Sequence, residues 1–210
     1  MSSLTGVQVS TVKDRWKWSA NSAGLFLVKT VKRMLKEEVV QDNSFVIDWC
    51  KWVPAKVNIH TWRMEMDRVP TAEALKKRNV GIGDSICPMC NSEEETVEHV
   101  FSACFIASNV WNGISSWVKI PNIYAFSLKV LHTFYKDLNL SEKKKDAMQG
   151  ILMIVCGSLW RARNNAKFSN SPIRIDSILS EIKALGFLWF SNRSKHKGLE
   201  WREWTSFVNM

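Results

Sequence analysis

The alternation of apolar and polar residues predicts a chain built mainly of helices. Beyond residue 56, apolar side chains recur at intervals of three and four residues, the spacing that places them on one face of an α-helix. We predict helices over residues 57–66, 72–78, 107–118, 128–138, 142–164 and about 172–189. The segment 142–164 should be the longest, with a buried stripe made of Ala147, Ile151, Ile154, Val155, Ser158, Leu159 and Ala162.

Three places in the sequence predict where helices begin. Thr71 and Ser141 each precede a helical segment, and their side-chain oxygens can accept a hydrogen bond from the first turn. Ser171-Pro172 combines a preferred N-cap residue with proline, which is favoured at the first helical position. We therefore expect helices to start directly after Thr71, Ser141 and Ser171.

A different pattern marks the N-terminal part of the chain. Residues 14–18 alternate so that Trp16 and Trp18 can face the same side, as on a half-buried strand. A turn over residues 19–24 separates them from the apolar residues 25–28, after which helical spacing begins. We predict a small β-hairpin leading into a helix. Core packing is the favoured role of Trp16 and Trp18, with base stacking as the alternative.

Four residues in the centre of the chain have the spacing of a closed zinc site. Cys87, Cys90, His99 and Cys104 follow the pattern Cys-x2-Cys-x8-His-x4-Cys. Three thiolates and one imidazole complete a tetrahedron, whereas a catalytic zinc usually keeps one position for water. The sequence therefore predicts one structural Zn²⁺ with these four residues as its ligands.

The alternative is that Cys87 and Cys90 form a redox pair, because Cys-x-x-Cys also occurs in thiol oxidoreductases. The residues on either side favour a loop over the strand and helix of a thioredoxin-like unit; they are Gly81, Gly83, Asp84, Asn91 and Ser92. The loop between the two ligand pairs carries Glu93, Glu94, Glu95 and Glu98. We expect these carboxylates to be solvated, since oxygen ligands compete poorly with thiolates for zinc.

The composition is that of a globular chain with a sizeable core. The 210 residues are 46% hydrophobic and include 11 Trp, and no apolar run approaches the roughly 18 residues that a membrane span needs. The start of the chain lacks the basic and apolar regions of a signal peptide. Five cysteines fit reduced thiols better than a disulfide framework, so we expect an intracellular protein, without a choice between nucleus and cytoplasm. Cys50 and Cys156 should be small buried residues.

The net charge of +9 is unevenly distributed. Residues 111–210 hold 15 Lys or Arg and 7 Asp or Glu, whereas residues 41–110 hold 7 and 10. A basic half is compatible with binding of RNA or DNA through phosphates, and equally with a solvated surface. The candidate nucleic-acid-binding residues are Lys143, Lys144, Lys145, Arg161, Arg163 and Lys167.

Motifs spread over residues 14–118 resemble one known family. They are Asp14-x-Trp16-x-Trp18, Gly24-x-Phe26, Trp52-x-Pro54-x-Lys56-Val57, Trp62-Arg63, Val69-Pro70-Thr71, Leu75-x-x-Arg78, Cys87-x-x-Cys90, Glu95-x-x-Glu98-His99-x-Phe101-x-x-Cys104 and Val110-Trp111. Together they are similar to the zinc-binding domain that follows the reverse transcriptase of plant LINE-type retrotransposons. The later motifs Leu159-Trp160-x-x-Arg163-Asn164 and Trp201-x-x-Trp204 resemble the segment that links this domain to a ribonuclease H-like domain. The resemblance implies a zinc module that assists nucleic-acid handling, with Cys87, Cys90, His99 and Cys104 as ligands.

The sequence departs from that family in its catalytic parts. It contains no Tyr-x-Asp-Asp motif and no set of spaced acidic residues after the Arg163-Asn164 segment. We predict a mainly α protein with a small N-terminal hairpin, divided into a flexible N-terminus (1–12), a reverse transcriptase zinc-binding-like domain (13–118) and a basic helical region (119–210). The expected function is a non-catalytic zinc module with nucleic-acid affinity. The alternative is a structural or protein-interaction domain, or a retrotransposon remnant, whose zinc only stabilises the fold and whose partner was a polymerase domain.

Overall fold

The computed structural model describes residues 17–19, 22–39, 47–123 and 128–208. The chain divides into two compact units, Met1–Ser44 and Phe45–Met210. Among the described residues of the first unit there is one helix, α1 (Val28–Val39). All four predicted metal ligands lie in the second unit.

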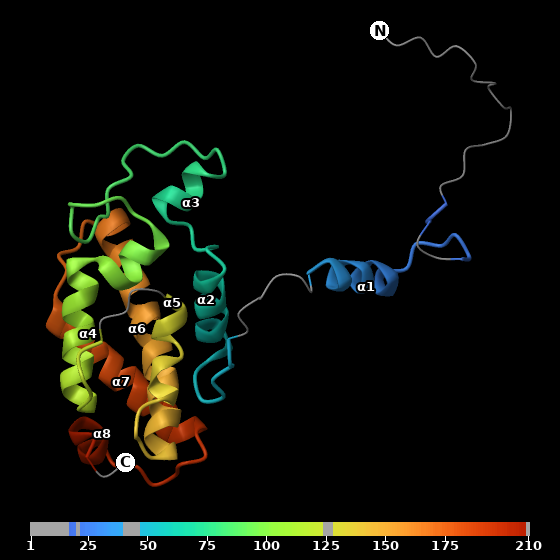
Figure 1. Cartoon of the computed structure of the whole chain (residues 1–210). Coiled ribbons are helices and arrows are strands. Elements are labelled where there is room, and N and C mark those ends of the chain that lie inside the picture. The colour runs from blue at the N-terminus through green and yellow to red at the C-terminus, as the bar shows by residue number, and fades with distance from the viewer. Residues whose placement is uncertain (1–16, 20–21, 40–46, 124–127, 209–210) are drawn as a thin grey trace, which may run out of the picture. The chain divides into compact units, whose positions relative to one another are not determined.

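The second unit is built of helices, as the apolar spacing predicts (Figure 1). Its longer helices are α2 (Ala55–Glu65), α4 (Phe105–Val118), α6 (Glu142–Ser169) and α7 (Ile175–Arg193). Its shorter elements are α3 (Ala72–Lys76), a π-helix (His99–Ala103), α5 (Leu128–Leu131), a 3₁₀ turn (Phe134–Lys136) and α8 (Trp201–Ser206). The mainly helical fold class is confirmed, although the helix predicted over 128–138 is divided into α5 and the 3₁₀ turn.

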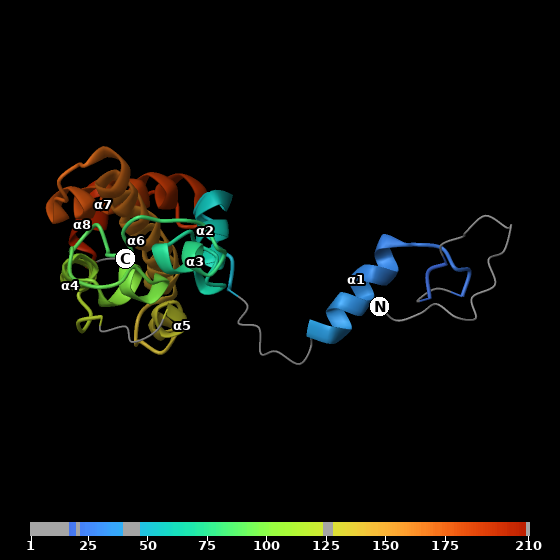
Figure 2. The same ribbon diagram turned by 90° about the horizontal axis from the view of Figure 1, so that it is seen from above.

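Helix α6 is the central element of the second unit. Figures 1 and 2 show it running between α2 and α4 with α7 alongside, and it packs directly against α2, α7 and the π-helix. Residues 151–156 are all buried, so this part of the helix is covered on every side. The predicted stripe is therefore too narrow, because Met148, Leu152, Met153 and Cys156 are buried as well.

Trp52 and Gly150 make a close contact that holds α6 against the segment before α2. The buried indole of Trp52 donates its N–H to the carbonyl of Asp146 at 2.8 Å. A Cβ atom on Gly150 would lie 2.1 Å from the Trp52 ring, so a side chain at this position would clash. Three other buried indoles also donate to main-chain carbonyls, those of Trp111, Trp117 and Trp204. The core therefore buries large aromatic rings without leaving these N–H groups unpaired.

Two of the three predicted helix starts are confirmed. The Thr71 side chain accepts a hydrogen bond from the N–H of Ala74, and the Ser141 side chain accepts one from the N–H of Lys144, each at 3.3 Å. The third start is wrong, because α7 begins only at Ile175. Ser171 instead donates its main-chain N–H to the carbonyl of Asn165, which lies in the last turns of α6. It therefore completes the end of α6.

The N-terminal hairpin is not supported by the described residues. Residues 14–16 lie outside them, and residues 17–19 and 22–27 contain no strand. They form a turn in which the N–H of Trp18 donates to the carbonyl of Gly24 at 2.9 Å, and the Trp18 and Phe26 rings meet edge to face. A two-stranded ribbon is only marginally stable without further strands or a helix to cover it.

The predicted limits of the three parts, 1–12, 13–118 and 119–210, stay a prediction. Cys50 and Cys156 are buried in the core of the second unit, and their burial raises the pKa of both thiols, that of Cys50 to about 11. Both are therefore neutral thiols at physiological pH. Among the described helices, none is long and apolar enough to cross a membrane.

Candidate metal centre

A tight loop presents the first two ligands, Cys87 and Cys90. Ile86 and Glu94 form an isolated antiparallel bridge, and the N–H of Cys87 donates to the carbonyl of Glu93 at 2.8 Å. The loop closes with the N–H of Asn91 donating to the carbonyl of Cys87 at 2.9 Å. Asn91 has a φ of 53°, a left-handed conformation that asparagine adopts more readily than most residues. The hydrogen bonds and the turn together bring the two sulfurs to the same side of the loop.

The other two ligands stand at the two ends of the π-helix. His99 begins it, and its N–H donates to the side chain of Thr96 at 2.9 Å. Cys104 ends it and directly precedes α4. The hydrogen bond with Cys87 and burial raise the pKa of the Cys104 thiol, and the main-chain N–H groups of Ile106 and Ala107, at the start of α4, lower it by less. A single wide helical turn thus orients an imidazole and a thiolate toward one point.

The four ligand atoms are close enough to share one zinc ion. All of them lie within 4.8 Å of one another, and the Cys90 sulfur is 3.3 Å from Nε2 of His99. In a tetrahedral site, zinc bonds of about 2.3 Å to sulfur and about 2.0 Å to nitrogen place the ligand atoms roughly 3.5 to 3.8 Å apart. Cys87, His99 and Cys104 are buried and Cys90 is partly exposed. The donor set and its spacing fit one Zn²⁺.

The protonation of the thiols is also suited to a metal. A hydrogen bond between Cys87 and Cys104 lowers the pKa of the Cys87 thiol to about 5 and raises that of Cys104. The two sulfurs therefore share a proton, with Cys87 as the thiolate. Zinc requires deprotonated thiols, so binding would displace this proton and make affinity increase with pH.

These features define the class of site: a closed Cys3His centre in which every coordination position of a tetrahedral zinc is taken by protein, as in structural zinc sites. The comparisons agree with this class. Residues 26–111, which include all four ligands, match the family described as zinc-binding in reverse transcriptase. The resemblance to a zinc-binding domain of reverse transcriptases is thereby confirmed for this segment, whereas the plant LINE origin and the link to a ribonuclease H-like domain stay predictions. No curated protein and no solved structure matches the chain.

A buried ion pair beside the metal centre was missed by the sequence analysis. Nε and Nη2 of Arg163 donate to the two carboxylate oxygens of Glu95, each at 2.9 Å. Glu95 is 0% exposed and Arg163 is 4% exposed. The expectation that the loop carboxylates are solvated is therefore wrong for Glu95, although Glu93, Glu94 and Glu98 are exposed. The pair joins the metal-binding loop to α6.

The main chain of Glu95 connects the same loop to two other segments. Its N–H donates to the carbonyl of Ser85 at 2.8 Å, and its carbonyl accepts from the N–H of Glu73 on α3 at 3.2 Å. A single residue between the two ligand pairs thus bonds to the loop, to α3 and to α6. In the sequence, only the residue types could have indicated the ion pair between Arg163 and Glu95, because an arginine in an apolar helix needs a buried carboxylate partner.

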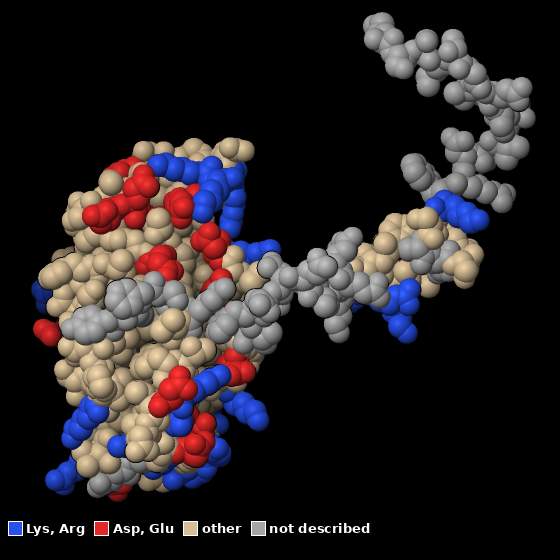
Figure 3. Space-filling view, viewed as in Figure 1, with Lys and Arg blue, Asp and Glu red and all other residues tan. Residues whose placement is uncertain are grey.

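The six candidate nucleic-acid-binding residues do not form one basic face. Lys143, Lys144 and Lys145 lie in the first turn of α6, whereas Arg161, Arg163 and Lys167 lie in its last third. At 1.5 Å per residue, Lys145 and Arg161 are separated by about 24 Å along the helix. Figure 3 shows basic and acidic side chains interspersed on the face in view, with Lys and Arg around the lower end, where α6 begins. Whether any of the six binds nucleic acid stays a prediction.

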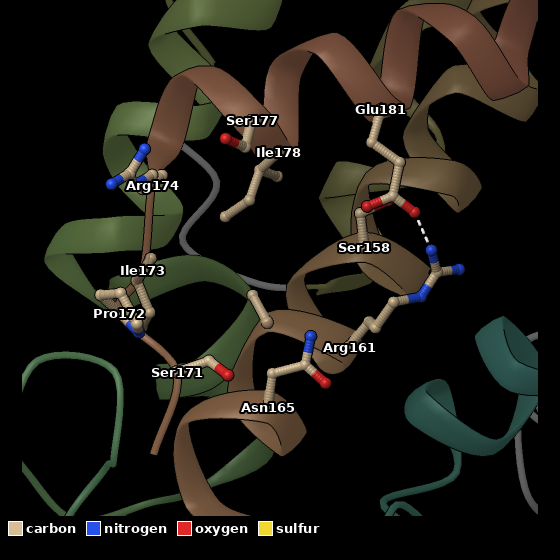
Figure 4. A pocket seen from close by; sticks show the side chains of 11 residues that line it. Ser158, Arg161, Asn165, Ser171, Pro172, Ile173, Arg174, Ser177, Ile178 and Glu181 are labelled. Atoms are coloured by element: carbon tan, nitrogen blue, oxygen red, sulfur yellow. Dashed lines mark ion pairs between the residues drawn. The ribbon is translucent and has the colours of Figure 1, made fainter. Parts of the chain in front are cut away.

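The arginines of this set are already paired. Arg163 is held in the interior by Glu95. Arg161 forms an ion pair with Glu181 at one side of a pocket of about 180 Å³ between α6 and the start of α7. Figure 4 shows Arg161 extended toward Glu181, on the side of the pocket away from Ser171 and Arg174. Among the described residues that line this pocket, Glu181 is the only carboxylate.

Proposed function

We propose that this protein is a non-catalytic zinc module, related to the zinc-binding domain of reverse transcriptases, that binds nucleic acid through phosphate contacts. The closed metal centre supports the non-catalytic part, because a zinc with four protein ligands has no position for water or substrate. The zinc then acts by stabilising the fold around the loop, the π-helix and α4.

The observation that carries the nucleic-acid part is the lysine cluster Lys143, Lys144 and Lys145 at the start of α6. The positive end of the helix dipole lies at the start of α6 and disfavours cations there, so the three lysines do not stabilise the helix. In the described part of the chain, no ion pair joins any of the three to a carboxylate. Lys145 donates to the carbonyl of Lys136, and the Lys144 ammonium lies 5.8 Å from the Phe207 ring. Three adjacent cations without acidic partners suit a phosphate backbone.

The test is binding of single-stranded RNA and duplex DNA across a salt series. Replacing Lys143, Lys144 and Lys145 by Gln should weaken binding to unrelated sequences alike and flatten the salt slope by up to about three units, roughly one for each phosphate that is no longer neutralised. The matched control replaces Lys51, Lys56 and Arg68 by Gln, an equal change of net charge in the acidic part of the chain. The proposal fails if the unchanged protein shows no binding at about 50 mM salt, where phosphate contacts are strongest.

A second candidate function is protein interaction, for example with a polymerase domain. Four consecutive apolar residues at the start of α1 and just before it are exposed; they are Leu25, Phe26, Leu27 and Val28. Contiguous exposed apolar side chains are typical of protein-interaction surfaces. Charge substitutions at Phe26 and Val28 should then abolish binding to such a partner and leave the salt-dependent nucleic-acid binding unchanged.

A further inference from the structure

A pocket in the second unit lies beside the metal-binding loop. It has a volume of about 410 Å³. One wall is apolar and comes from Pro70, Leu75 on α3 and Ile82 in the segment before Cys87. Further lining comes from the C-terminal third of α6, with Trp160, Asn164 and Phe168 among its residues. The pocket therefore combines apolar surface with two aromatic rings.

The aromatic wall is held in place by the buried ion pair. The guanidinium of Arg163 lies 4.8 Å from the Trp160 ring and 5.7 Å from the Phe168 ring. Because Glu95 fixes this guanidinium with two hydrogen bonds, it is a rigid support for both rings. Phe168 is nevertheless 77% exposed, so its ring remains accessible to a ligand. An exposed ring with a fixed support is a pre-formed stacking surface.

Besides Arg163, three polar residues line the same pocket: Asn164, Lys167 and Asp84, whose Oδ1 accepts a hydrogen bond from the N–H of Ile86 at 2.9 Å. Oδ1 of Asn164 accepts a hydrogen bond from Arg163 at 2.9 Å, which leaves the amide NH2 of Asn164 to donate to a ligand. Lys167 contacts the carbonyl of Asp84 at a long 3.5 Å, so its ammonium retains donors for an anion. An apolar peptide side chain would leave these donors unpaired, which is costly in a desolvated site. A planar base attached to a phosphate could accept hydrogen bonds from both the Asn164 amide and the Lys167 ammonium.

We propose that this pocket receives one base of single-stranded nucleic acid, stacked on Phe168, with Asn164 donating to the base edge and Lys167 contacting the adjacent phosphate. The inference rests on the proposed nucleic-acid function and adds a base contact to its phosphate contacts. Stacking on an aromatic ring tolerates every base, because each base has a π-face. The site therefore favours single strands over duplexes without selecting a sequence.

The test compares labelled short single-stranded DNA with a strand of equal length that lacks bases. Phe168→Leu keeps an apolar side chain but removes the ring, and should weaken binding of the base-bearing strand about 5- to 150-fold, the range measured for loss of one stacked base. Phe168→Tyr should bind as the unchanged protein does. Trp49→Leu, at an exposed aromatic residue that is not among those lining the pocket, is the matched control and should have no effect. The strand without bases should bind the unchanged protein and Phe168→Leu equally.

Each contrary result identifies which proposal has failed. If Phe168→Leu binds the base-bearing strand normally, or weakens the strand without bases to the same degree, the base site is wrong while salt-dependent binding still supports the phosphate contacts. If no strand binds the unchanged protein, both proposals fail. A leucine-rich helical peptide is added as a separate ligand; saturable binding of it that Phe168→Leu abolishes, with unchanged DNA binding, overturns the base site in favour of a protein partner.

Discussion

At the scale of single residues, Glu95 and Arg163 connect the metal centre to the helical core. Glu95 stands between the two ligand pairs, and Arg163 lies in the last third of α6. Both are buried and their hydrogen bonds are bidentate. Two buried charges in this geometry satisfy one another, but either one alone would be left without compensation in the interior.

We predict that removal of one partner is much more costly than removal of both. Arg163→Met and Glu95→Gln should each lower the free energy of unfolding by about 3 to 5 kcal/mol, because each leaves an unpaired buried polar or charged group. The double variant should lose less than the sum of the two. The measurement is chemical denaturation of all three variants with zinc in excess.

An exposed ion pair supplies the comparison. Nζ of Lys77, at the C-cap of α3, lies 2.9 Å from a carboxylate oxygen of Glu73 and 3.5 Å from one of Asp67, and all three side chains are accessible to solvent. Lys77→Met should lower the free energy of unfolding far less than Arg163→Met or Glu95→Gln does, because solvent-exposed ion pairs contribute little to stability. If the losses for Arg163→Met and Glu95→Gln simply add in the double variant, the two residues are not coupled and the connection between loop and core is wrong.

At the scale of elements, α6 organises the second unit because it is covered on several sides. The positions where other elements approach it closely need small residues, and Gly150 is the clearest case because the Trp52 ring occupies the space a Cβ would need. Gly157 lies seven residues later in the same helix, with nothing within 4 Å of its would-be Cβ. The two glycines therefore differ in packing while sharing the same helix.

We predict opposite effects for two identical substitutions. Gly150→Ala should destabilise the protein by about 1 to 3 kcal/mol, the usual cost of overpacking a core. Gly157→Ala should stabilise it by up to about 1 kcal/mol, because alanine is the better helix former and meets no clash. Thermal unfolding of both variants checks this. Equal effects would mean that Trp52 does not pack on α6 as described.

At the scale of the whole molecule, the sequence predicts what depends on local spacing and misses what depends on distant pairs. The four metal ligands lie within 18 residues and follow a recognisable pattern, so the sequence reveals them. The caps Thr71 and Ser141 are predictable for the same reason, since an N-cap acts on its own helix. Glu95 and Arg163 are 68 residues apart, and nothing in their spacing indicates that they meet.

The same limit explains why the sequence does not show that the six candidate basic residues fall into two separate groups. Charge counted along the sequence groups Arg161 and Arg163 with Lys143, Lys144 and Lys145, but the length of α6 separates the two groups and carboxylates from other elements neutralise the arginines. The number of buried positions on α6 could likewise not be predicted from the sequence, because one apolar stripe does not indicate how many other elements pack against a helix.

The central claim is that a single structural zinc, bound by Cys87, Cys90, His99 and Cys104, stabilises this fold. The most direct test is the zinc content of purified protein, measured as zinc per chain. The unchanged protein should hold one zinc, Cys87→Ser and His99→Ala should lose it, and Cys50→Ser, which changes a buried thiol outside the centre, should retain it. Full zinc retention by both ligand variants would contradict the account.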